Sequence, residues 1–202
     1  MKLRDATPEQ IQKVDSLLKY YILKREELRM NGILKLVSGE EFLLFGIVTN
    51  SPYSDDETPI RGYSLYALPL STPFEESLDV HYLPKVLLSP RPTDIECIFW
   101  YPFYRAVRDH IAKTYCELES ESLSCIEINE IRMGRHKAQG LGGYMLSLAL
   151  AECQQACSKK DMVITHVSAD VIIDDDNRLK KVRRFYRRNG FRRSYDCFYK
   201  LI

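Results

Sequence analysis

The sequence has no long hydrophobic run, little net charge and no Cys-x-x-Cys pair. Its longest uncharged stretch, residues 138–151, is shorter than the roughly 18 apolar residues that a membrane-spanning helix needs. No apolar run follows the charged residues at the N-terminus, so we expect no signal peptide there. Lys and Arg number 29 against 28 Asp and Glu, so the net charge of +1 predicts neither an acidic tail nor a nucleic-acid coat. We expect a soluble, cytoplasmic protein without a membrane partner.

Glycine and proline are modest at 9 each, whereas 13 Tyr and 8 Phe supply large apolar side chains. Collagen-like and disordered classes are therefore excluded. A chain of 202 residues can bury one sizeable core, and we expect a single domain over residues 1–202.

Six cysteines are present without a secretory context, so we expect reduced and mostly buried thiols rather than disulfides. Cys153 and Cys157 lie four residues apart and would share one face of a helix. Two thiols without a His or further Cys nearby favour packing over a metal site. We predict no bound metal.

The N-terminal half predicts a strand, a helix and a hairpin. Residues 2–6 can form a short strand, and the Thr-Pro-Glu-Gln run at 7–10 is a strong helix start. Apolar residues continue at helical spacing, either unbroken or with one break, to the Asn-Gly pair at 31–32, a natural helix stop. Residues 41–48 and 62–68 predict two strands joined by a polar, acidic loop.

The middle of the chain is harder to interpret, because six of the nine prolines fall between residues 69 and 102. We predict only a short helix near 74–78, an apolar run at 95–100 and helical spacing over 103–118.

The last third predicts alternating strands and helices. Strands are expected at 123–133, 163–173 and 191–202, with helices at 140–157 and 177–188. This alternation favours an α/β protein with a mixed α+β layer.

The strand at 123–133 changes its apolar face along its length. Ile126 and Ile128 share one face, whereas Ile131 and Met133 have the opposite phase, with the switch at residues 129–130. A strand that changes its buried face needs an extra residue, a β-bulge, which re-aims side chains and suits a ligand site. The other interpretation is a strand that is buried on both faces.

A glycine-rich turn follows this strand and opens the next helix. Unpaired N–H groups at a helix N-terminus favour phosphate, and the basic residues 135–137 add positive charge. The dinucleotide fingerprint would need a glycine where Met145 stands, and the Gly-Lys-Ser/Thr triplet of a P-loop is absent. Gly-x-Ser-x-Gly and His-Glu-x-x-His motifs are absent too.

Three segments resemble the GCN5-related N-acetyltransferase (GNAT) superfamily. Lys137-x-x-Gly140-x-Gly142 is similar to its pyrophosphate loop, Arg/Gln-x-x-Gly-x-Gly/Ala. Residues 3–11 look like its first strand and helix start, and Asn177 followed by residues 185–191 resembles its ending, Tyr-x-x-x-Gly-Phe.

The resemblance covers residues 1–50 and 123–202 well and residues 70–120 poorly, where an inserted or divergent segment is expected. This chain departs from the family pattern in having Lys137 for Arg or Gln, three Asp at 174–176, and two extra residues before Tyr186.

The resemblance implies a central mixed, mostly antiparallel sheet whose fourth and fifth strands splay apart, with acetyl coenzyme A (acetyl-CoA) as cosubstrate in the gap. The backbone of Ile131 and Met133 would pair with the pantetheine arm, and Asn177 would bond to that arm or serve only as a helix N-cap. The resemblance also assigns the pyrophosphate to the turn. The residues implied there are Lys137, Gln139, Gly140, Leu141, Gly142, Gly143 and Tyr144.

Acetyl transfer to an amine needs a base, an oxyanion site and a proton for the departing thiolate. Tyr186, from the family motif, would protonate the sulfur, and otherwise it is a packing tyrosine. Glu130, aimed by the bulge, is the candidate base, and otherwise it is a surface carboxylate. His136 and His166 are further titratable groups.

Charge is unevenly distributed, because residues 159–202 hold 12 Lys and Arg with 6 Asp, a net +6, and the remainder is −5. The basic helix and strand at 178–193 are either a solvated face that meets the cofactor's 3′-phosphate, which we favour, or a nucleic-acid surface. The acidic loops at 55–57 and 174–176 would suit a cationic amine.

We therefore predict an acetyl-CoA-dependent N-acetyltransferase that transfers an acetyl group to a primary amine of a small molecule, protein or peptide. The alternative is a catalytically degenerate GNAT-fold module that binds or regulates, with nucleic-acid contact through residues 178–193. A homodimer stays open.

Overall fold

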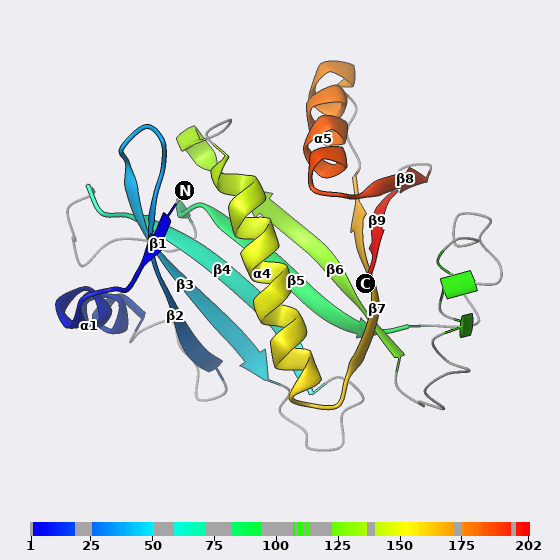
Figure 1. Cartoon of the computed structure of the whole chain (residues 1–202), viewed down its shortest axis with the longest axis horizontal. Coiled ribbons are helices and arrows are strands. Elements are labelled where there is room, and N and C mark those ends of the chain that lie inside the picture. The colour runs from blue at the N-terminus through cyan, green and yellow to red at the C-terminus, as the bar shows by residue number, and fades with distance from the viewer. Residues whose placement is uncertain are drawn as a thin grey trace.

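The computed structural model describes residues 2–18, 26–50, 59–71, 82–93, 107, 109–110, 112–113, 123–136, 140–171, 175–194 and 197–202. Those residues form one nine-stranded sheet with three longer helices and a short 3₁₀ turn, η3 (Figure 1). The elements are β1 Lys2–Arg4, α1 Pro8–Leu18, β2 Glu26–Lys35, β3 Glu41–Asn50, β4 Ile60–Pro69, β5 Lys85–Pro92, β6 Leu123–Arg132, η3 Gly134–His136, α4 Leu141–Ser158, β7 Val163–Asp170, α5 Asp176–Arg188, β8 Arg192–Ser194 and β9 Cys197–Leu201.

The strand order is β1-β2-β3-β4-β5-β6-β7-β9-β8. All neighbouring strands are antiparallel except β6 and β7, which are parallel and joined through α4. Parallel strands need such a crossover, because a tight turn would leave the second strand antiparallel to the first. The mixed α/β class, with a mostly antiparallel sheet flanked by helices, is confirmed.

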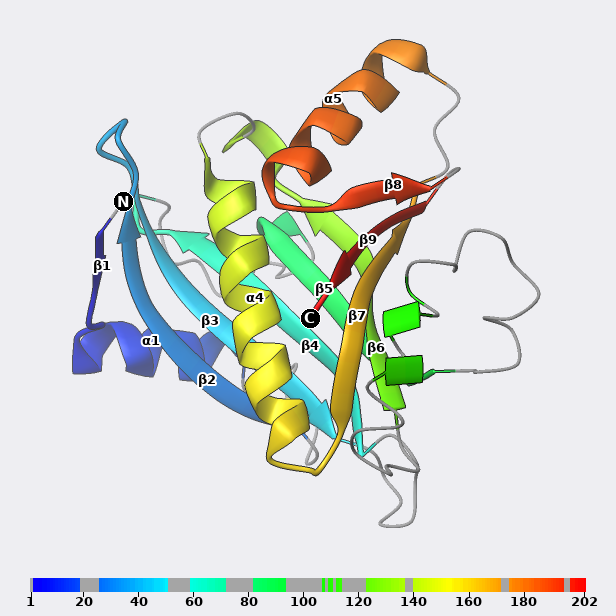
Figure 2. The same cartoon turned by 45° about the vertical axis from the view of Figure 1, so that its right-hand side comes forward.

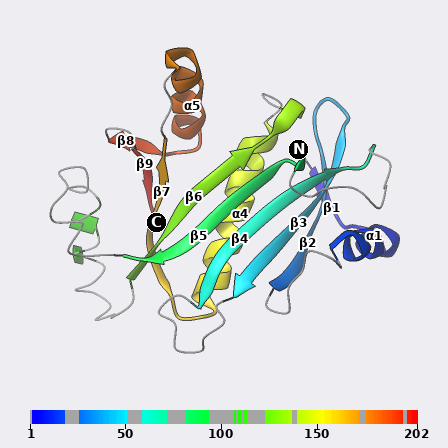
Figure 3. The ribbon, with the colours of Figure 1, turned by 180° about the vertical axis from the view of Figure 1, so that it is seen from behind.

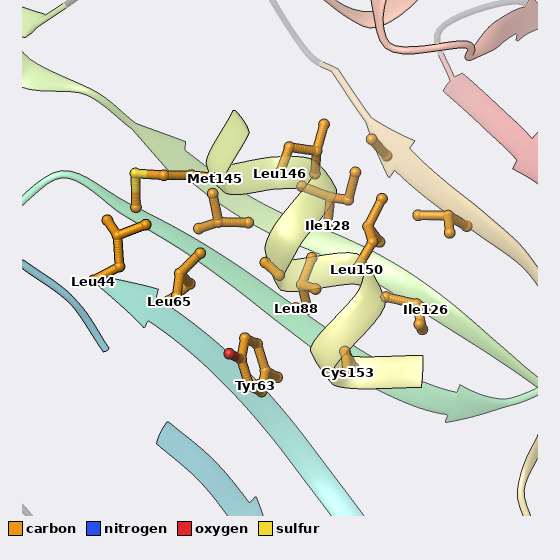
Figure 4. Packing of buried hydrophobic residues seen from close by; sticks show 14 of the residues in the cluster. Leu44, Tyr63, Leu65, Leu88, Ile126, Ile128, Met145, Leu146, Leu150 and Cys153 are labelled. Carbon is orange, nitrogen blue, oxygen red and sulfur yellow. The ribbon is translucent and has the colours of Figure 1, made fainter. Parts of the chain in front are cut away.

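Both faces of the sheet are buried around β3. Leu43 and Phe45 pack on one side with Val14 of α1, whereas Phe42 and Leu44 belong to the larger cluster beneath α4. The apolar run of β3 is therefore continuous rather than alternating. Figure 4 shows the α4 side of this core, and Figure 3 shows the sheet from behind, with α4 on its far side.

The prediction of a helix extending to residues 31–32 is wrong. α1 ends at Leu18, and residues 31–32 lie inside β2 at a break in its register with β3. Gly32 has a φ of +96°, and a Cβ there would lie 2.5 Å from the carbonyl oxygen of Arg4 on β1. A glycine that permits this close strand contact at positive φ looks in sequence like a helix C-cap. Residues 19–25 lie outside the described residues.

A strand that the sequence did not predict, β5, lies in the proline-rich segment. Pro90 and Pro92 are tolerated because β4 pairs only with residues 85–88 of β5, so beyond Leu88 the prolines have β6 alone as a paired neighbour. Proline cannot donate to a ladder and is confined to such one-sided positions. The acidic loop at 55–57, the helix at 74–78, the run at 95–100 and most of 103–118 lie outside the described residues.

Several further boundaries differ from the prediction. β1 ends at Arg4, two residues before the predicted end, and β7 ends at Asp170 rather than residue 173. The last strand is in fact two antiparallel strands, β8 and β9. The predicted hairpin is confirmed as β3 and β4, and the predicted burial of Cys153 and Cys157 on α4 is confirmed too.

Candidate functional site

A bulge interrupts β6 at the predicted position. Glu130 is opposite Leu87 and Ile128 is opposite Leu88, so Asn129 is the extra residue between them. The Asn129 side chain donates a 2.6 Å hydrogen bond to Ser89 on β5. Ile131 then packs against the core under α4, so the bulge restores the apolar phase to the buried face and turns Glu130 away from it.

β6 and β7 separate just before the bulge. Their parallel pairing runs along Leu123–Glu127 of β6, but β6 continues to Arg132, while the end of β7 pairs with β9. Figure 2 shows the two strands separating towards the end of the molecule that carries α5. The splay expected between a fourth and a fifth strand is therefore present, but between the sixth and the seventh, because β2 and β5 were not predicted as strands.

The N-terminus of α4 lies next along the chain. Gly140 occupies its N-cap at a φ of +82°, and no side chain caps the helix. The first N–H groups of a helix have no intrahelical partner, so those of Leu141, Gly142 and Gly143 are oriented to receive an acceptor. Gly140 is required there because L residues rarely adopt this φ. Lys137 and Gln139 lie outside the described residues.

Gly142 and Gly143 also allow α5 to approach α4. A Cβ on Gly142 would lie 3.2 Å from Met133 and 3.5 Å from Phe185, and a Cβ on Gly143 would lie 3.1 Å from Asn189. From the sequence, these glycines suited either a phosphate or simply the end of a strand and the start of a helix. The structure gives them a packing role too, because they join the end of β6, the start of α4 and the end of α5.

Glu130 lies between two cations. Its Oε2 is 3.0 Å from Nζ of Lys85 on β5, and its Oε1 is 2.8 Å from a guanidinium nitrogen of Arg132. Lys85 is buried, so its charge depends on this carboxylate for compensation. Sequence reasoning missed Lys85, because nothing local connects a lysine in a proline-rich segment with a strand 45 positions later.

Tyr186 is the buried residue of α5. Its ring stacks on Phe198 with centroids 4.7 Å apart and meets Phe191 edge-on at 5.2 Å. Burial, together with nearby Cys197, raises the pKa of Tyr186 to about 12, so the phenol keeps its proton at neutral pH. The packing role considered in the sequence is present, and the chemical role stays a prediction.

Asn177 is not the N-cap of α5. That position belongs to Asp175, whose carboxylate accepts hydrogen bonds from the N–H groups of Asn177 at 2.8 Å and Arg178 at 3.1 Å. Both bonds lower the pKa of Asp175, and the bond from Arg178 has the larger effect. Asn177 is exposed in the first turn, so its predicted bond to a cofactor arm stays a prediction, whereas the N-cap alternative is wrong.

Two histidines are buried near the site elements. His136 of η3 lies 3.2 Å from Oε2 of Glu40 and meets Phe42 edge-on at 4.9 Å, which ties the turn before α4 to the β2–β3 hairpin. Burial lowers the pKa of His166 on β7 to about 4, with a further contribution from His110. His166 is thus neutral at physiological pH and lies 3.0 Å from Oγ1 of Thr165.

Within the described ranges, no cluster of three His, Cys, Asp or Glu side chains could hold a metal ion. Nor does any described helix combine the length and the apolar character that crossing a membrane would take.

No protein-family model matches the sequence, and no curated protein matches it significantly. Two solved structures are similar to this fold. One is NAA60 of Arabidopsis thaliana in complex with acetyl-CoA, at 11% identity and a TM-score of 0.38 over 100% of this chain and 98% of that one. The other is an apo mutant of an agmatine N-acetyltransferase, at 9% identity and a TM-score of 0.34 over 100% and 99%. Such TM-scores, below 0.5, are too low to assign a function to this chain.

Proposed function

We propose that this protein is an acetyl-CoA-dependent N-acetyltransferase of the GNAT type that acts on a primary amine. The observation that carries the proposal is the arrangement of β6, the turn that follows it and the N-terminus of α4. After Glu127, β6 leaves its parallel neighbour, and the next long helix along the chain, α4, begins at an N-terminus that no side chain caps. A separated strand edge offers backbone groups to an extended ligand, and the helix start offers N–H groups to a phosphate.

The residues at this place fit acetyl-CoA. The backbone of Ile131 and Met133 would hold the pantetheine arm, and the amides of residues 140–143, with Lys137 and Gln139, would hold the pyrophosphate. The N–H of Tyr144 already donates to the carbonyl oxygen of Gly140 at 3.2 Å, so its amide is not part of the proposed site. Asn177 would bond to the arm from the start of α5. When bound, the cosubstrate supplies an activated acetyl thioester.

The chain's own groups would then manage the protons. Glu130, directly or through water, would take a proton from the attacking amine as the new N–C bond forms. Tyr186 would give its phenolic proton to the sulfur as the C–S bond breaks. The phenol carries its proton at neutral pH, although burial makes it a weaker acid than a free tyrosine, so the proposed role depends on the place of Tyr186 in the motif and not on its pKa.

The ion pairs of Glu130 favour a second candidate function. Because both carboxylate oxygens are within 3.0 Å of a cation, Glu130 would have to leave one partner to accept a proton. A module that binds acetyl-CoA without turning it over is compatible with this geometry.

Thermal stabilisation tests cofactor binding. At 100-fold excess over Kd, acetyl-CoA should add about 2.7 kcal/mol, or about 5–10 °C in Tm for a domain of this size. Gly140→Ala should remove the shift. Gly39→Ala is the matched control, because Gly39 has a φ of +88° with open space around its Cα at the β2–β3 turn. Both variants lose stability through strain, but only Gly140→Ala should lose the shift. An unshifted parent protein would refute the proposal.

Release of free thiol with a panel of polyamines, lysine and aminoglycosides tests catalysis. Tyr186→Phe keeps the aromatic packing and removes the hydroxyl, so turnover should fall by about 10²-fold or more while the acetyl-CoA shift persists. Tyr63→Phe, a buried tyrosine on β4, is the control and should keep full turnover. Binding without turnover of any amine would favour the second candidate function.

A further inference from the structure

α5 has one face on the protein body and one face in solvent. Val182 and Phe185 pack against the core beneath α4, and Tyr186 is buried. With 3.6 residues per turn, the residues roughly opposite these are Lys180, Arg184 and Arg187. All three are exposed, as is the neighbouring Arg188. Figures 1 to 3 agree that α5 stands beyond the end of the sheet. We call Lys180, Arg184, Arg187 and Arg188 the outer row.

Among the described residues, the outer row has no acidic partner. α5 contains seven Lys and Arg with one Asp, a net charge of +6. Across the portion of the chain that the structure describes, no carboxylate lies within ion-pair distance of the four cations of the outer row. Like charges on successive turns destabilise a helix, so the row is tolerated only because the buried face of α5 holds the helix in place.

Most of the outer row does not face the proposed cofactor site. α4 meets α5 through Phe185 and Asn189, which lie against Gly142 and Gly143. A ligand between the two helices would therefore face that side of α5. Lys180, Arg184 and Arg187 project from the opposite side, so a cosubstrate alone does not account for them.

A second feature extends the charge beyond the helix. Where α5 ends, a hollow of about 210 Å³ is lined by Gly190, Arg192, Tyr199, Lys200 and Leu201. Both Arg192 and Lys200 are exposed, so two more cations border a concave surface just beyond the C-terminal end of α5. At 1.5 Å per residue, the row from Lys180 to Arg188 spans about 12 Å, which corresponds to three or four phosphates of one strand at a rise of about 3.4 Å each along the duplex axis.

We propose that the outer row, with the hollow at its end, binds the phosphate backbone of a nucleic acid independently of sequence. A membrane is disfavoured because an interfacial helix needs a free apolar face, whereas the apolar residues of α5 pack on the body. The row also lacks an aromatic platform for stacking bases. Contacts to phosphate alone position a protein on a duplex without reading its sequence.

The test is fluorescence anisotropy of the full chain with short labelled RNA and DNA duplexes at several KCl concentrations. The four cations of the outer row should contribute about −3.6 to the slope of log K against log salt, and Arg192 and Lys200 should make the slope steeper. The double variant Lys180→Gln/Arg184→Gln should lower the slope by about 1.8 and the affinity by roughly tenfold or more. Comparison of the RNA and DNA arms identifies the favoured nucleic acid.

The control is Lys159→Gln/Lys160→Gln. These two lysines are exposed at the far end of α4, and their removal changes the net charge by the same amount. The control should bind like the parent. Equal losses in both double variants would reduce the effect to overall charge and overturn the proposal, as would an undetectable affinity of the parent.

Three competitors complete the test. Excess acetyl-CoA should leave duplex binding unchanged, and displacement would assign the row to the cofactor. Polyglutamate or vesicles of phosphatidylcholine with phosphatidylserine should bind more weakly than the duplexes, and tighter binding of either would overturn the proposal. The proposed enzyme function is tested separately, because Lys180→Gln/Arg184→Gln should keep the thermal shift with acetyl-CoA.

Discussion

The two helices that flank the splayed strands are held in place by different means. α4 buries eight of its residues against the sheet, and its sequence is mostly apolar. α5 buries Tyr186 alone, supported by partly buried Val182 and Phe185, and carries seven cations. Core packing stabilises most protein helices, and this is the case for α4. α5 depends instead on an aromatic anchor near its C-terminus and on the Asp175 cap at its N-terminus.

This difference separates two tasks. α4 is fixed on the core, so its uncapped N-terminus is a rigid position for a ligand, and rigid elements suit sites that need accurate geometry. α5 has most of its surface in solvent, so its sequence is free to carry charge. Changes to α4 should therefore affect the whole fold, while changes to α5 should act locally.

Truncation in the core of α4 should have the largest effect. Leu146→Ala removes a side chain that is only 1% exposed and should destabilise the protein by about 3–5 kcal/mol. Val182→Ala on α5 removes fewer atoms from a half-buried site and should cost about 1 kcal/mol or less. Denaturant unfolding with unchanged m-values measures both. Similar losses for the two variants would contradict the comparison.

The strand between the two helices should show a pH effect almost as large. His166 has an ordinary pKa of 6.5 and a folded pKa of about 4. Between these values the unfolded chain binds more protons, so stability falls as pH drops from 6.5 towards 4, by about 3 kcal/mol. His166→Gln should remove this part of the acid sensitivity. Unfolding free energies at pH 7 and 4.5 measure it.

His110→Gln is the control for that experiment. His110 contributes the smaller part of the shift, so this variant should keep most of the pH dependence. If parent and His166→Gln lose equal stability on acidification, His166 is not the group responsible.

Local patterns predicted the bulge of β6 and the start of α4 better than they predicted the order of strands in the sheet. The change of phase between Ile128 and Ile131 located the bulge, because the side-chain period of a strand is two and only an extra residue can shift it. Gly140 and Gly142 located the start of α4, because the positive φ of Gly140 and the close packing at Gly142 both restrict the residue type locally.

Long-range contacts were not predictable in this way. The Asn-Gly pair at 31–32 resembles a helix end in sequence. In the structure, Gly32 has its positive φ where it meets β1 closely, a contact that the sequence does not reveal. The partners of Glu130 and His136 come from distant segments, Lys85 on β5 and Glu40 before β3. Tertiary context, rather than propensity, decides such positions.

A smaller effect of the opposite sign is expected beneath α4. The hydroxyl of Tyr63 is buried and finds no hydrogen-bond partner among the described residues, and burial raises its pKa. An unpaired buried polar group is unfavourable, so Tyr63→Phe should stabilise the protein by about 1 kcal/mol. Chemical denaturation measures the gain. A loss of stability would contradict the prediction that the buried hydroxyl is unfavourable.

The smallest effect is expected at the cap of α5. Asp175 accepts two backbone N–H bonds, so Asp175→Ala leaves these donors without a protein partner and should fray the first turn with only a small loss of global stability. Asp176→Ala is the control, because it removes the same charge from the next residue, which does not cap the helix. The cap's contribution should be present above pH 3.8 and fade as pH falls through the lowered pKa of Asp175.

Hydrogen exchange of the amides of Asn177 and Arg178 measures the fraying, and equal exchange in both variants would show that charge rather than capping holds the turn. Because the outer row begins one turn later, fraying in Asp175→Ala should also weaken duplex binding more than Asp176→Ala does, which joins the local stability of α5 to the surface it presents.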